Sequence, residues 1–370
     1  MPIITSIAIY HVTMPLIEPW RTAYGQDDVI GSILVKMDAG GFVGWGETTP
    51  LTNPTYSPEY AAGVFAVIKN ILAPQIIGKN IETSKDLYRE YDWVAGNFFA
   101  KAGLDAAWWD LYARIKNQPL WKLIGGVNPT IDVGADFGIQ NHIDILLANI
   151  SDALNKGFKR IKLKYAPGWG LEVIKVVRKT FPNSVFHIDC NAGYTLNDLP
   201  MFKNLDKYNL AMIEQPLMRD DLNDHATLQR AIETPICLDE SITSPDKVRK
   251  AIEIGAARWI NIKPGRVGGF TNAIEINRIC EERGIPCWTG GMLESALGTS
   301  FCRALATLPN MQYPSDVFPS TRFYKQDLST PPIELSGPSQ MILPDTPGVG
   351  AEPIPDLVEQ HTINQAVIEK

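Results

Sequence analysis

The sequence predicts an α/β protein: a closed (β/α) barrel preceded by a smaller α+β unit. From about residue 130, short β-rich runs alternate with segments of helical apolar spacing, which is typical of successive βα units and a parallel sheet. There are eight such runs, as in a closed barrel. The chain has 370 residues, 45% of them apolar, which is enough for a large core and more than one structural unit.

Residues 1–125 form the predicted α+β unit. Its strands are indicated by alternating runs, and its helices by apolar spacing around residues 58–75, 83–93 and 99–116. The strand runs are ITSIAIYHV, SILVKMDA and FVGWGET.

Residues 126–330 form the predicted barrel. Helical segments such as LEVIKVVRKTF and FTNAIEINRICEERG separate its strands, and Gly284 ends the second of these helices. Active-site groups of such a barrel lie at the C-terminal ends of the strands. The eight runs are 133–139, 160–165, 185–190, 210–215, 235–240, 258–263, 285–290 and, more weakly, 310–316.

Residues 331–370 are rich in Pro and Gly and contain no further βα repeat, so we expect this segment to return to the first unit.

Charge and composition exclude several classes of partner. The net charge is −7 and the pI is near 5.4, without a long basic run, which favours a small-molecule partner over nucleic acid or an anionic membrane. The first residues lack the features of a secretory signal, and no window of about 18 apolar residues occurs, so we expect a cytoplasmic protein. Five dispersed cysteines without CxxC spacing fit reduced thiols better than disulfides or zinc ligands.

Charged residues end five successive strands at nearly constant spacing. Lys164, Asp189, Glu214, Asp239 and Lys263 are separated by 25, 25, 25 and 24 residues, so each occupies an equivalent place on its strand. Three carboxylates that converge at one mouth would repel one another unless a cation binds. All-oxygen ligation suits a hard ion, so the sequence predicts a Mg²⁺ site, with Mn²⁺ as a possible substitute.

The two lysines lie on opposite walls of the predicted barrel. Strands two and six are four apart in a ring of eight, so Lys164 and Lys263 can address two faces of one carbon. A lysine base needs a lowered pKa, which the nearby cations Lys162 and Arg266 could provide. The pattern therefore predicts metal-assisted removal of a proton next to a carboxylate, through an enediolate.

These strand ends also carry a family resemblance. The runs RIKLK, IDCNAGY, IEQPL, PICLDES, NIKPGRVGG and GGMLESALG resemble the muconate-lactonizing branch of the enolase superfamily. More narrowly, the chain resembles N-acylamino acid (N-succinylamino acid) racemases and o-succinylbenzoate synthases, from MPLIEPWRTAYG and VGWGE through AGNFFAKAGLDAAWWDLYA to GVGAEPIPDL.

The resemblance implies a modified TIM-like barrel, a capping domain made of residues 1–125 and the tail, and a homo-oligomer. It also implies roles for individual residues. Lys164 and Lys263 correspond to the acid/base pair, and Asp189, Glu214 and Asp239 to the metal ligands. An arginine at the place of Arg266 accompanies racemase activity.

Further positions are expected around the substrate by the same resemblance. Lys162, Asn191 and Glu240 match positions behind the ligands or beside the substrate, and Gly291 and Met292 follow strand seven. Loops 19–25 and 49–59 match segments that close over the substrate. Four aromatic residues could pack on its side chain or merely hold the domain interface: Trp20, Tyr24, Tyr56 and Phe323.

The chain departs from the family pattern at two strands. Strand one carries Asp136, where a small or hydroxylated residue is usual, and strand eight reads Pro314-Ser315-Asp316, where Gly-Asp is usual. A further anion at the mouth would disfavour a substrate with a second carboxylate.

Several functions therefore remain open. Racemisation of N-acylamino acids and syn-dehydration to o-succinylbenzoate use the same lysines. A dipeptide epimerase or cycloisomerase is the alternative; Asp316 is not part of an Asp-x-Asp motif, although Asp136 could replace it. A Schiff-base aldolase would act without metal. A catalytically inactive barrel that serves as a binding or scaffolding protein is disfavoured, because all five charged strand-end residues are present.

Overall fold

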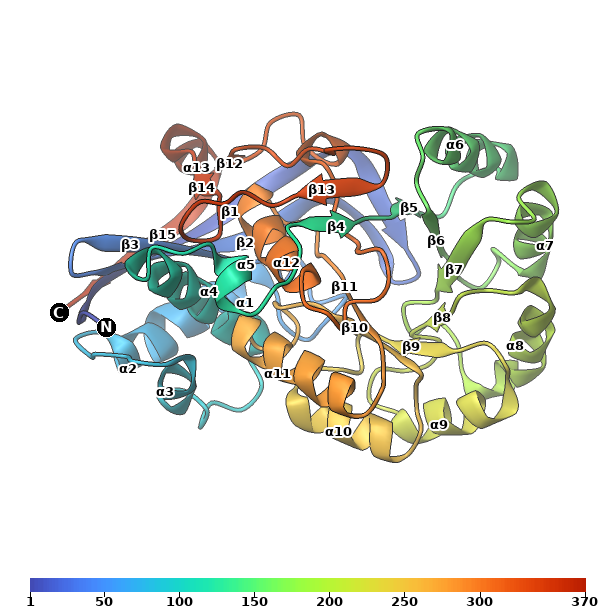
Figure 1. The fold of residues 1–370 in the computed structure, drawn as a ribbon, viewed down its shortest axis with the longest axis horizontal. Helices are drawn as coiled ribbons and strands as arrows, with labels where there is room; N and C mark the ends of the chain where they lie inside the picture. Colours follow the sequence, from blue (N-terminus) through green and yellow to red (C-terminus); the bar gives the residue numbers. More distant parts are fainter.

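The computed structural model describes residues 1–370 and contains two main sheets (Figure 1). One is a four-stranded antiparallel sheet in the order β15-β1-β2-β3, and the other is a seven-stranded parallel sheet that runs in sequence order from β5 to β11. The strands of the antiparallel sheet are β1 (Ile4–Thr22), β2 (Gly25–Ala39), β3 (Phe42–Thr48) and β15 (Thr362–Glu369). Those of the parallel sheet are β5 (Ala135–Phe137), β6 (Arg160–Lys164), β7 (Val185–Asp189), β8 (Ile213–Glu214), β9 (Ile236–Leu238), β10 (Trp259–Ile262) and β11 (Cys287–Thr289).

The N-terminal helices cover one face of the antiparallel sheet, and α4 (Phe98–Ile115) packs on β3. Gly44 and Gly46 allow this close approach, because a Cβ atom at either position would lie within 2.4 Å of the α4 backbone at Ala107. This packing explains the spacing of the two glycines in VGWGE. The other helices of this region are α1 (Ala61–Val67), a π-helical turn (Ile68–Leu72), α2 (Ala73–Ile76), α3 (Ser84–Arg89) and α5 (Leu120–Leu123).

Seven helices surround the parallel sheet in the order expected for βα units (Figure 1). Their apolar residues face the strands; in α10 (Pro245–Glu253), for example, Val248 and Ala251 are buried. The hydroxyl of Ser244 caps that helix by accepting from the Lys247 N–H at 3.2 Å. The other six are α6 (Ile143–Asn155), α7 (Leu171–Thr180), α8 (Leu199–Leu205), α9 (Leu222–Ala231), α11 (Phe270–Glu282) and α12 (Ala296–Ala306).

The eighth position of the barrel differs from the prediction. Residues 310–316 are not a strand; single parallel bridges join Met311 to Cys287 and Ser315 to Val133. The Asp316 N–H also donates to the Thr289 carbonyl at 2.9 Å. Pro314 lacks an N–H group and cannot continue a ladder, which explains why this segment contacts both edges of the sheet without forming a strand.

The tail runs back along the antiparallel sheet. Strand β15 pairs with β1 from Ser6–Glu369 to Val12–Thr362, and the two chain ends lie close together (Figure 1). The tail also contains α13 (Pro355–His361) and two short strand pairs, β13 (Gln340–Ile342) with β4 (Thr130–Asp132) and β14 (Glu352–Pro353) with β12 (Ser329–Thr330). No helix combines the length and apolarity needed to cross a membrane.

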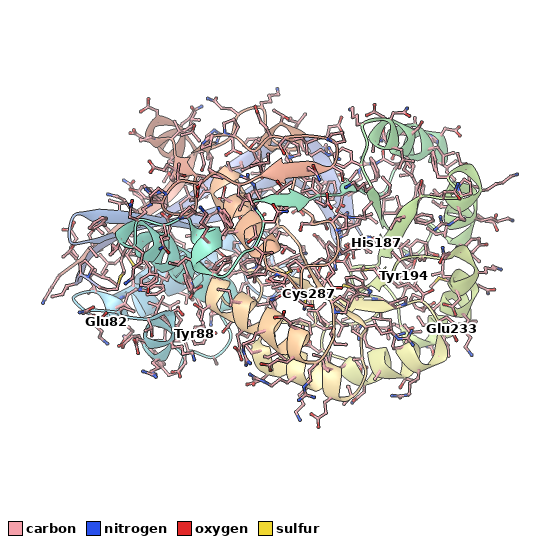
Figure 2. All side chains as sticks on the ribbon, viewed as in Figure 1. Glu82, Tyr88, His187, Tyr194, Glu233 and Cys287 are labelled. Atoms are coloured by element: carbon pink, nitrogen blue, oxygen red, sulfur yellow. The ribbon has the colours of Figure 1, made fainter.

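Side chains fill the inside of the barrel (Figure 2). His187 on β7 is wholly buried, with its ring centroid 5.4 Å from that of Trp288 and 5.5 Å from that of Tyr313. Burial lowers the pKa of His187 well below its ordinary value, so this histidine is a neutral core residue.

Candidate active site

A cavity lies at the C-terminal ends of the barrel strands, beneath the β1–β2 hairpin. Both regions of the chain line it, because the lysines come from the barrel, Trp20 and Tyr24 from the hairpin, and Tyr56 from loop 49–59. The lining residues are Trp20, Tyr24, Asp27, Leu51, Tyr56, Asp136, Lys162, Lys164, Asn191, Lys263, Gly291, Met292, Leu293, Asp316 and Phe318.

Lys164, the last residue of β6, lies at one side of the cavity. Its Nζ donates to Asp189 Oδ2 at 2.7 Å and to Asn191 Oδ1 at 3.0 Å. Asn191 adopts a left-handed backbone conformation (φ +41°), and its N–H donates to Asp189 Oδ1 at 3.0 Å. Its amide also donates to Glu240 at 3.0 Å. The turn after β7 therefore fixes both partners of the Lys164 ammonium.

Lys263 follows β10 and meets a residue of the first unit. Its Nζ donates to Asp239 Oδ2 at 2.9 Å and to the Tyr56 hydroxyl at 3.2 Å, and it lies 4.6 Å from the centroid of the Tyr56 ring. The same hydroxyl donates to Asp239 Oδ1 at 3.0 Å. Arg266 pairs with Asp239 and donates to the Tyr56 hydroxyl at 3.2 Å. Tyr56 thus ties loop 49–59 to the lysine.

The pKa of Lys263 is raised, whereas a lowered pKa was predicted. Burial disfavours the charged form of Lys263, but the Tyr56 hydroxyl that accepts its hydrogen bond and the Glu240 and Glu214 carboxylates outweigh burial and raise its pKa. The pKa of Lys162 is raised for the same reason, chiefly by Asp189 and Asp316. The predicted lowering of the pKa is therefore not found for Lys263, whose neighbouring carboxylates are compensated only by basic side chains.

The predicted metal ligands are buried and adjacent but point at basic groups. Lys162 Nζ lies 3.0 Å from Asp189 Oδ2 and 2.9 Å from Glu214 Oε2, while Asp239 pairs with Lys263 and Arg266. As a result, no three His, Cys, Asp or Glu side chains are arranged to hold a metal ion.

The donor chemistry of these carboxylates nevertheless fits a hard cation. Asp189, Glu214 and Asp239 are at most 1% exposed and offer only oxygen atoms. Asp189 pairs directly with Glu214 across β7 and β8. Glu214 Oε2 is wholly buried and its one charged neighbour is Lys162 Nζ at 2.9 Å, in a geometry that makes no hydrogen bond. A divalent ion fits here if these carboxylates rotate away from Lys162 and Arg266.

Asp136 is not a free anion, which corrects the expectation about a second carboxylate. The wholly buried guanidinium of Arg160 donates to Asp136 Oδ1 at 2.6 Å and also pairs with Asp316. Asp316 accepts from Lys162 as well, at 2.8 Å. Both carboxylates are thus compensated within the barrel, so Asp136 gives no reason to exclude a dianionic substrate. Because Arg160 holds the Asp136 carboxylate, Asp136 is also unavailable to bind the amino group of a dipeptide.

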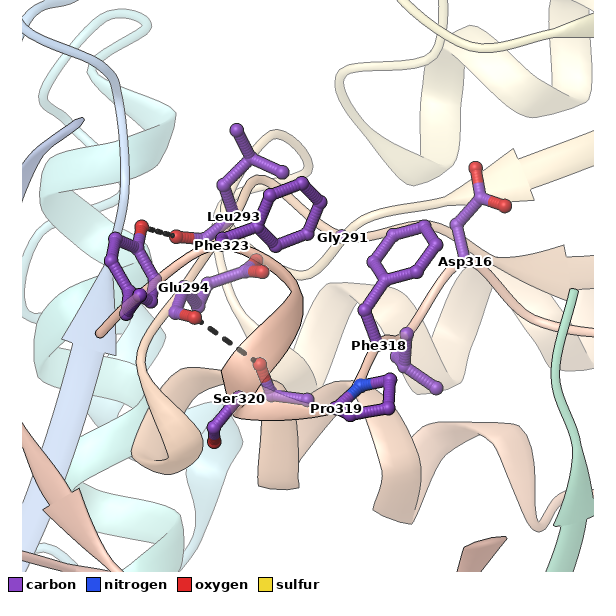
Figure 3. Close-up of a pocket in the computed structure, with 11 residues that line it drawn as sticks. Gly291, Leu293, Glu294, Asp316, Phe318, Pro319, Ser320 and Phe323 are labelled. Carbon is purple, nitrogen blue, oxygen red and sulfur yellow. Dashed lines mark hydrogen bonds between the residues drawn. The ribbon is translucent and has the colours of Figure 1, made fainter. Parts of the chain in front are cut away.

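The other residues predicted around the substrate either line the cavity or lie behind its lining. Tyr24 lines the cavity and packs edge-on against Tyr56, with ring centroids 6.2 Å apart. Phe323 does not line it; its ring packs edge-on against Trp20 at 5.6 Å and against Phe318 at 5.2 Å. Phe323 instead lines a neighbouring pocket with Phe318, Leu293 and Glu294 (Figure 3). Arg266 and Glu240 lie behind the lining residues they contact.

Sequence reasoning missed Arg160 and Asp27. Arg160 shares a strand face with Lys162 and Lys164, because side chains alternate along β6, so the run R-x-K-x-K was the available signal. Asp27 pairs with Trp20 across the hairpin, which places both on one face, but that register is not evident from the sequence.

Comparisons with known proteins agree with this architecture. Residues 4–125 match the mandelate racemase/muconate lactonizing enzyme N-terminal domain, and residues 146–357 match the enolase C-terminal domain-like family. The chain belongs to the enolase superfamily.

Relatives of this enolase-superfamily protein include o-succinylbenzoate synthases and N-succinylamino acid racemases. It is 40% identical to an o-succinylbenzoate synthase of Geobacillus kaustophilus, over 96% of this chain and 95% of that one. It is 38% identical to an N-succinylamino acid racemase of Thermus thermophilus, over 95% of each chain. A crystal structure of an enolase-superfamily member from Listeria innocua superposes with a TM-score of 0.96 at 33% identity and covers both chains completely.

Proposed function

We propose that this chain removes the proton α to a substrate carboxylate and acts as an N-acylamino acid racemase, an o-succinylbenzoate synthase, or both. The observation that carries the proposal is that Lys164 and Lys263 line one cavity from strands four positions apart in the barrel. A carbon held between them presents one face to each Nζ. Relatives with both functional names support the two reactions equally.

The two lysines would exchange roles in racemisation. One neutral Nζ takes the α-proton and leaves an enediolate, while the other, as an ammonium, returns a proton to the opposite face. In syn-dehydration one lysine serves as base and then as acid. Asn191 and Asp189 would orient Lys164, and Tyr56 and Asp239 would orient Lys263, through the contacts of 2.7–3.2 Å described above.

Asp189, Glu214 and Asp239 would hold a divalent cation, as enolase-superfamily enzymes generally use Mg²⁺ with a lysine or histidine base. Such an ion, when bound, supplies positive charge that stabilises the enediolate. Lys162 and Arg266 would then face fewer unpaired carboxylates. Both cations would lower the pKa of the neighbouring catalytic lysine and favour its neutral form.

Dipeptide epimerisation is a second candidate that one observation favours. Asp27 lines the cavity and is 8% exposed, without a hydrogen bond or ion pair from its side chain, so it could bind the amino group of a dipeptide. The oligomeric state remains a prediction from the family resemblance.

The test combines proton exchange with product analysis. The protein with Mg²⁺ is incubated in D₂O with N-succinyl-L-phenylalanine, N-acetyl-L-phenylalanine, L-Ala-L-Phe and the hydroxy-acid precursor of o-succinylbenzoate. Loss of the α-proton NMR signal with appearance of the D-form supports racemisation, and formation of the aromatic product supports the synthase. Exchange with the dipeptide alone would favour the epimerase, and no exchange with any compound would contradict the proposal.

A further inference from the structure

Three carboxylates line the cavity, and only Asp27 is without a basic partner. Asp136 and Asp316 both contact Arg160, and Asp316 also contacts Lys162. The Asp27 side chain makes no hydrogen bond or ion pair, although the residue is 8% exposed. The carboxylate is largely enclosed, faces the cavity and has no protein partner, so a cationic group brought in by a ligand can form a charge-assisted hydrogen bond with it.

The neighbours of Asp27 suit such a cation. Trp20 pairs with Asp27 in the antiparallel register of β1 and β2, so their side chains lie on the same face of the hairpin. Both line the cavity, together with Tyr24. Aromatic faces beside a carboxylate bind ammonium and especially guanidinium groups, and they also pack on the apolar stem that carries them.

The charges of the cavity are arranged in two groups. Lys162, Lys164 and Lys263 come from the barrel, where the substrate carboxylate would bind, while Asp27 comes from the hairpin of the first unit. A ligand with its carboxylate toward the barrel and a cation at its far end matches both groups.

We propose that Asp27 determines substrate specificity by binding a positively charged group remote from the reacting carboxylate. This inference rests on the proposed function, and it names the substrate class of the same site. The cation has two chemical sources: the basic side chain of an N-acylated amino acid, or the free amino group of a dipeptide. Binding experiments separate the two sources.

The test uses pairs of ligands that differ in one charge, with binding measured by calorimetry in the presence of Mg²⁺. N-acetyl-L-arginine is compared with N-acetyl-L-citrulline, and L-Ala-L-Phe with N-acetyl-L-Ala-L-Phe. The wild type should bind the cationic member of one pair about tenfold or more tightly, the range for a charge-assisted hydrogen bond. A preference in the first pair identifies a basic side chain, and one in the second pair a dipeptide amino group.

Two variants decide whether Asp27 is responsible. Asp27→Asn should bring the preferred pair close to a ratio of one. Asp28→Asn is the control, because it removes one negative charge from an exposed residue whose side chain points to the other face of the strand. This variant should still prefer the cationic ligand. Equal binding within both pairs by the wild type, or a preference that survives in Asp27→Asn, overturns the inference. Calorimetry needs no turnover, so failure of the proposed reaction is seen separately as lack of α-proton exchange.

Discussion

The guanidinium of Arg160 on β6 donates to the carboxylate of Asp136 on the neighbouring β5 at 2.6 Å, and both residues are buried. The same guanidinium pairs with Asp316. One buried cation therefore pairs both with Asp136, by which this chain departs from the family pattern, and with Asp316 of the altered strand-eight motif. The pairing makes both carboxylates part of the barrel core.

Replacing Arg160 should destabilise the fold strongly. Arg160→Met leaves Asp136 and Asp316 buried with one cation fewer, and we expect the free energy of unfolding to fall by about 3–5 kcal/mol. Urea denaturation measures this change. Lys159→Met is the matched control, because Lys159 pairs with Asp132 at the surface at 3.2 Å. This substitution should lower the free energy of unfolding by less than about 1 kcal/mol. Equal losses in the two variants would contradict the assigned role of Arg160.

Removing either lysine should restrict exchange to one enantiomer. Lys164→Ala and Lys263→Ala each leave one base, so each variant should exchange the α-proton of a single enantiomer in D₂O and lose racemisation by about 10²–10⁴-fold. ¹H NMR with each pure enantiomer measures the exchange.

Lys175→Ala is the control for this experiment, since that side chain is 60% exposed on α7. Wild-type racemisation in either lysine variant would show that the two groups are not the acid/base pair.

The Tyr56 hydroxyl should contribute to turnover more than to binding. It contacts Lys263, Arg266 and Asp239 within 3.2 Å, so Tyr56→Phe removes one of the hydrogen bonds that position the Lys263 ammonium. We expect kcat to fall roughly tenfold or more with little change in KM. Tyr60→Phe, a change at a 41% exposed ring of the same region, should leave both constants unaltered. A change confined to KM would assign Tyr56 to substrate binding instead.

Mg²⁺ should stabilise the fold independently of activity. The ion would compensate Asp189, Glu214 and Asp239, so the wild type should show a Tm that rises with Mg²⁺ concentration. The measurement is differential scanning calorimetry at constant ionic strength. Glu214→Gln should weaken the response.

The control for Glu214→Gln is Asp246→Asn, whose carboxylate is 91% exposed; it should respond like the wild type. A Tm that is insensitive to Mg²⁺ would argue against the proposed ligand set.

Asp105 should make stability depend on pH. This buried residue of α4 accepts from the Thr271 N–H at 3.0 Å and connects the first unit to α11. Burial raises its pKa from 3.8 to about 6. A raised carboxyl pKa means that the folded state binds the proton more tightly, so its stabilising contribution is complete below pH 3.8 and is lost as the pH rises through about 6.

The measurement compares the wild type with Asp105→Asn, whose side chain cannot titrate. From about pH 5 to about pH 8 the wild type should lose about 1 kcal/mol relative to this variant in urea denaturation. Asp152→Asn, at a carboxylate 63% exposed on α6, should show no such shift. A pH-independent difference for Asp105→Asn would rule out titration of Asp105 in this range.

The sequence by itself determined the βα repeat, seven of the eight barrel positions as strands, and which residues end them. Periodicity and constant spacing are local properties, so Lys164, Asp189, Glu214 and Lys263 could be assigned to matching strand ends from the order of residues alone. The last position could not be assigned in this way, because residues 310–316 are held by bridges to Val133 and Cys287 and not by their own propensity.

Only the tertiary structure decided which charges meet. Asp136, Asp316 and Arg160 are far apart in the chain, and their pairing depends on how the two edges of the barrel close. The same holds for Tyr56 on Lys263 and for Asp27 at the cavity, since each results from packing the first unit over the barrel. Electrostatic interactions depend on distance and burial, which strand spacing alone does not specify, so pKa values and free carboxylates became evident only in three dimensions.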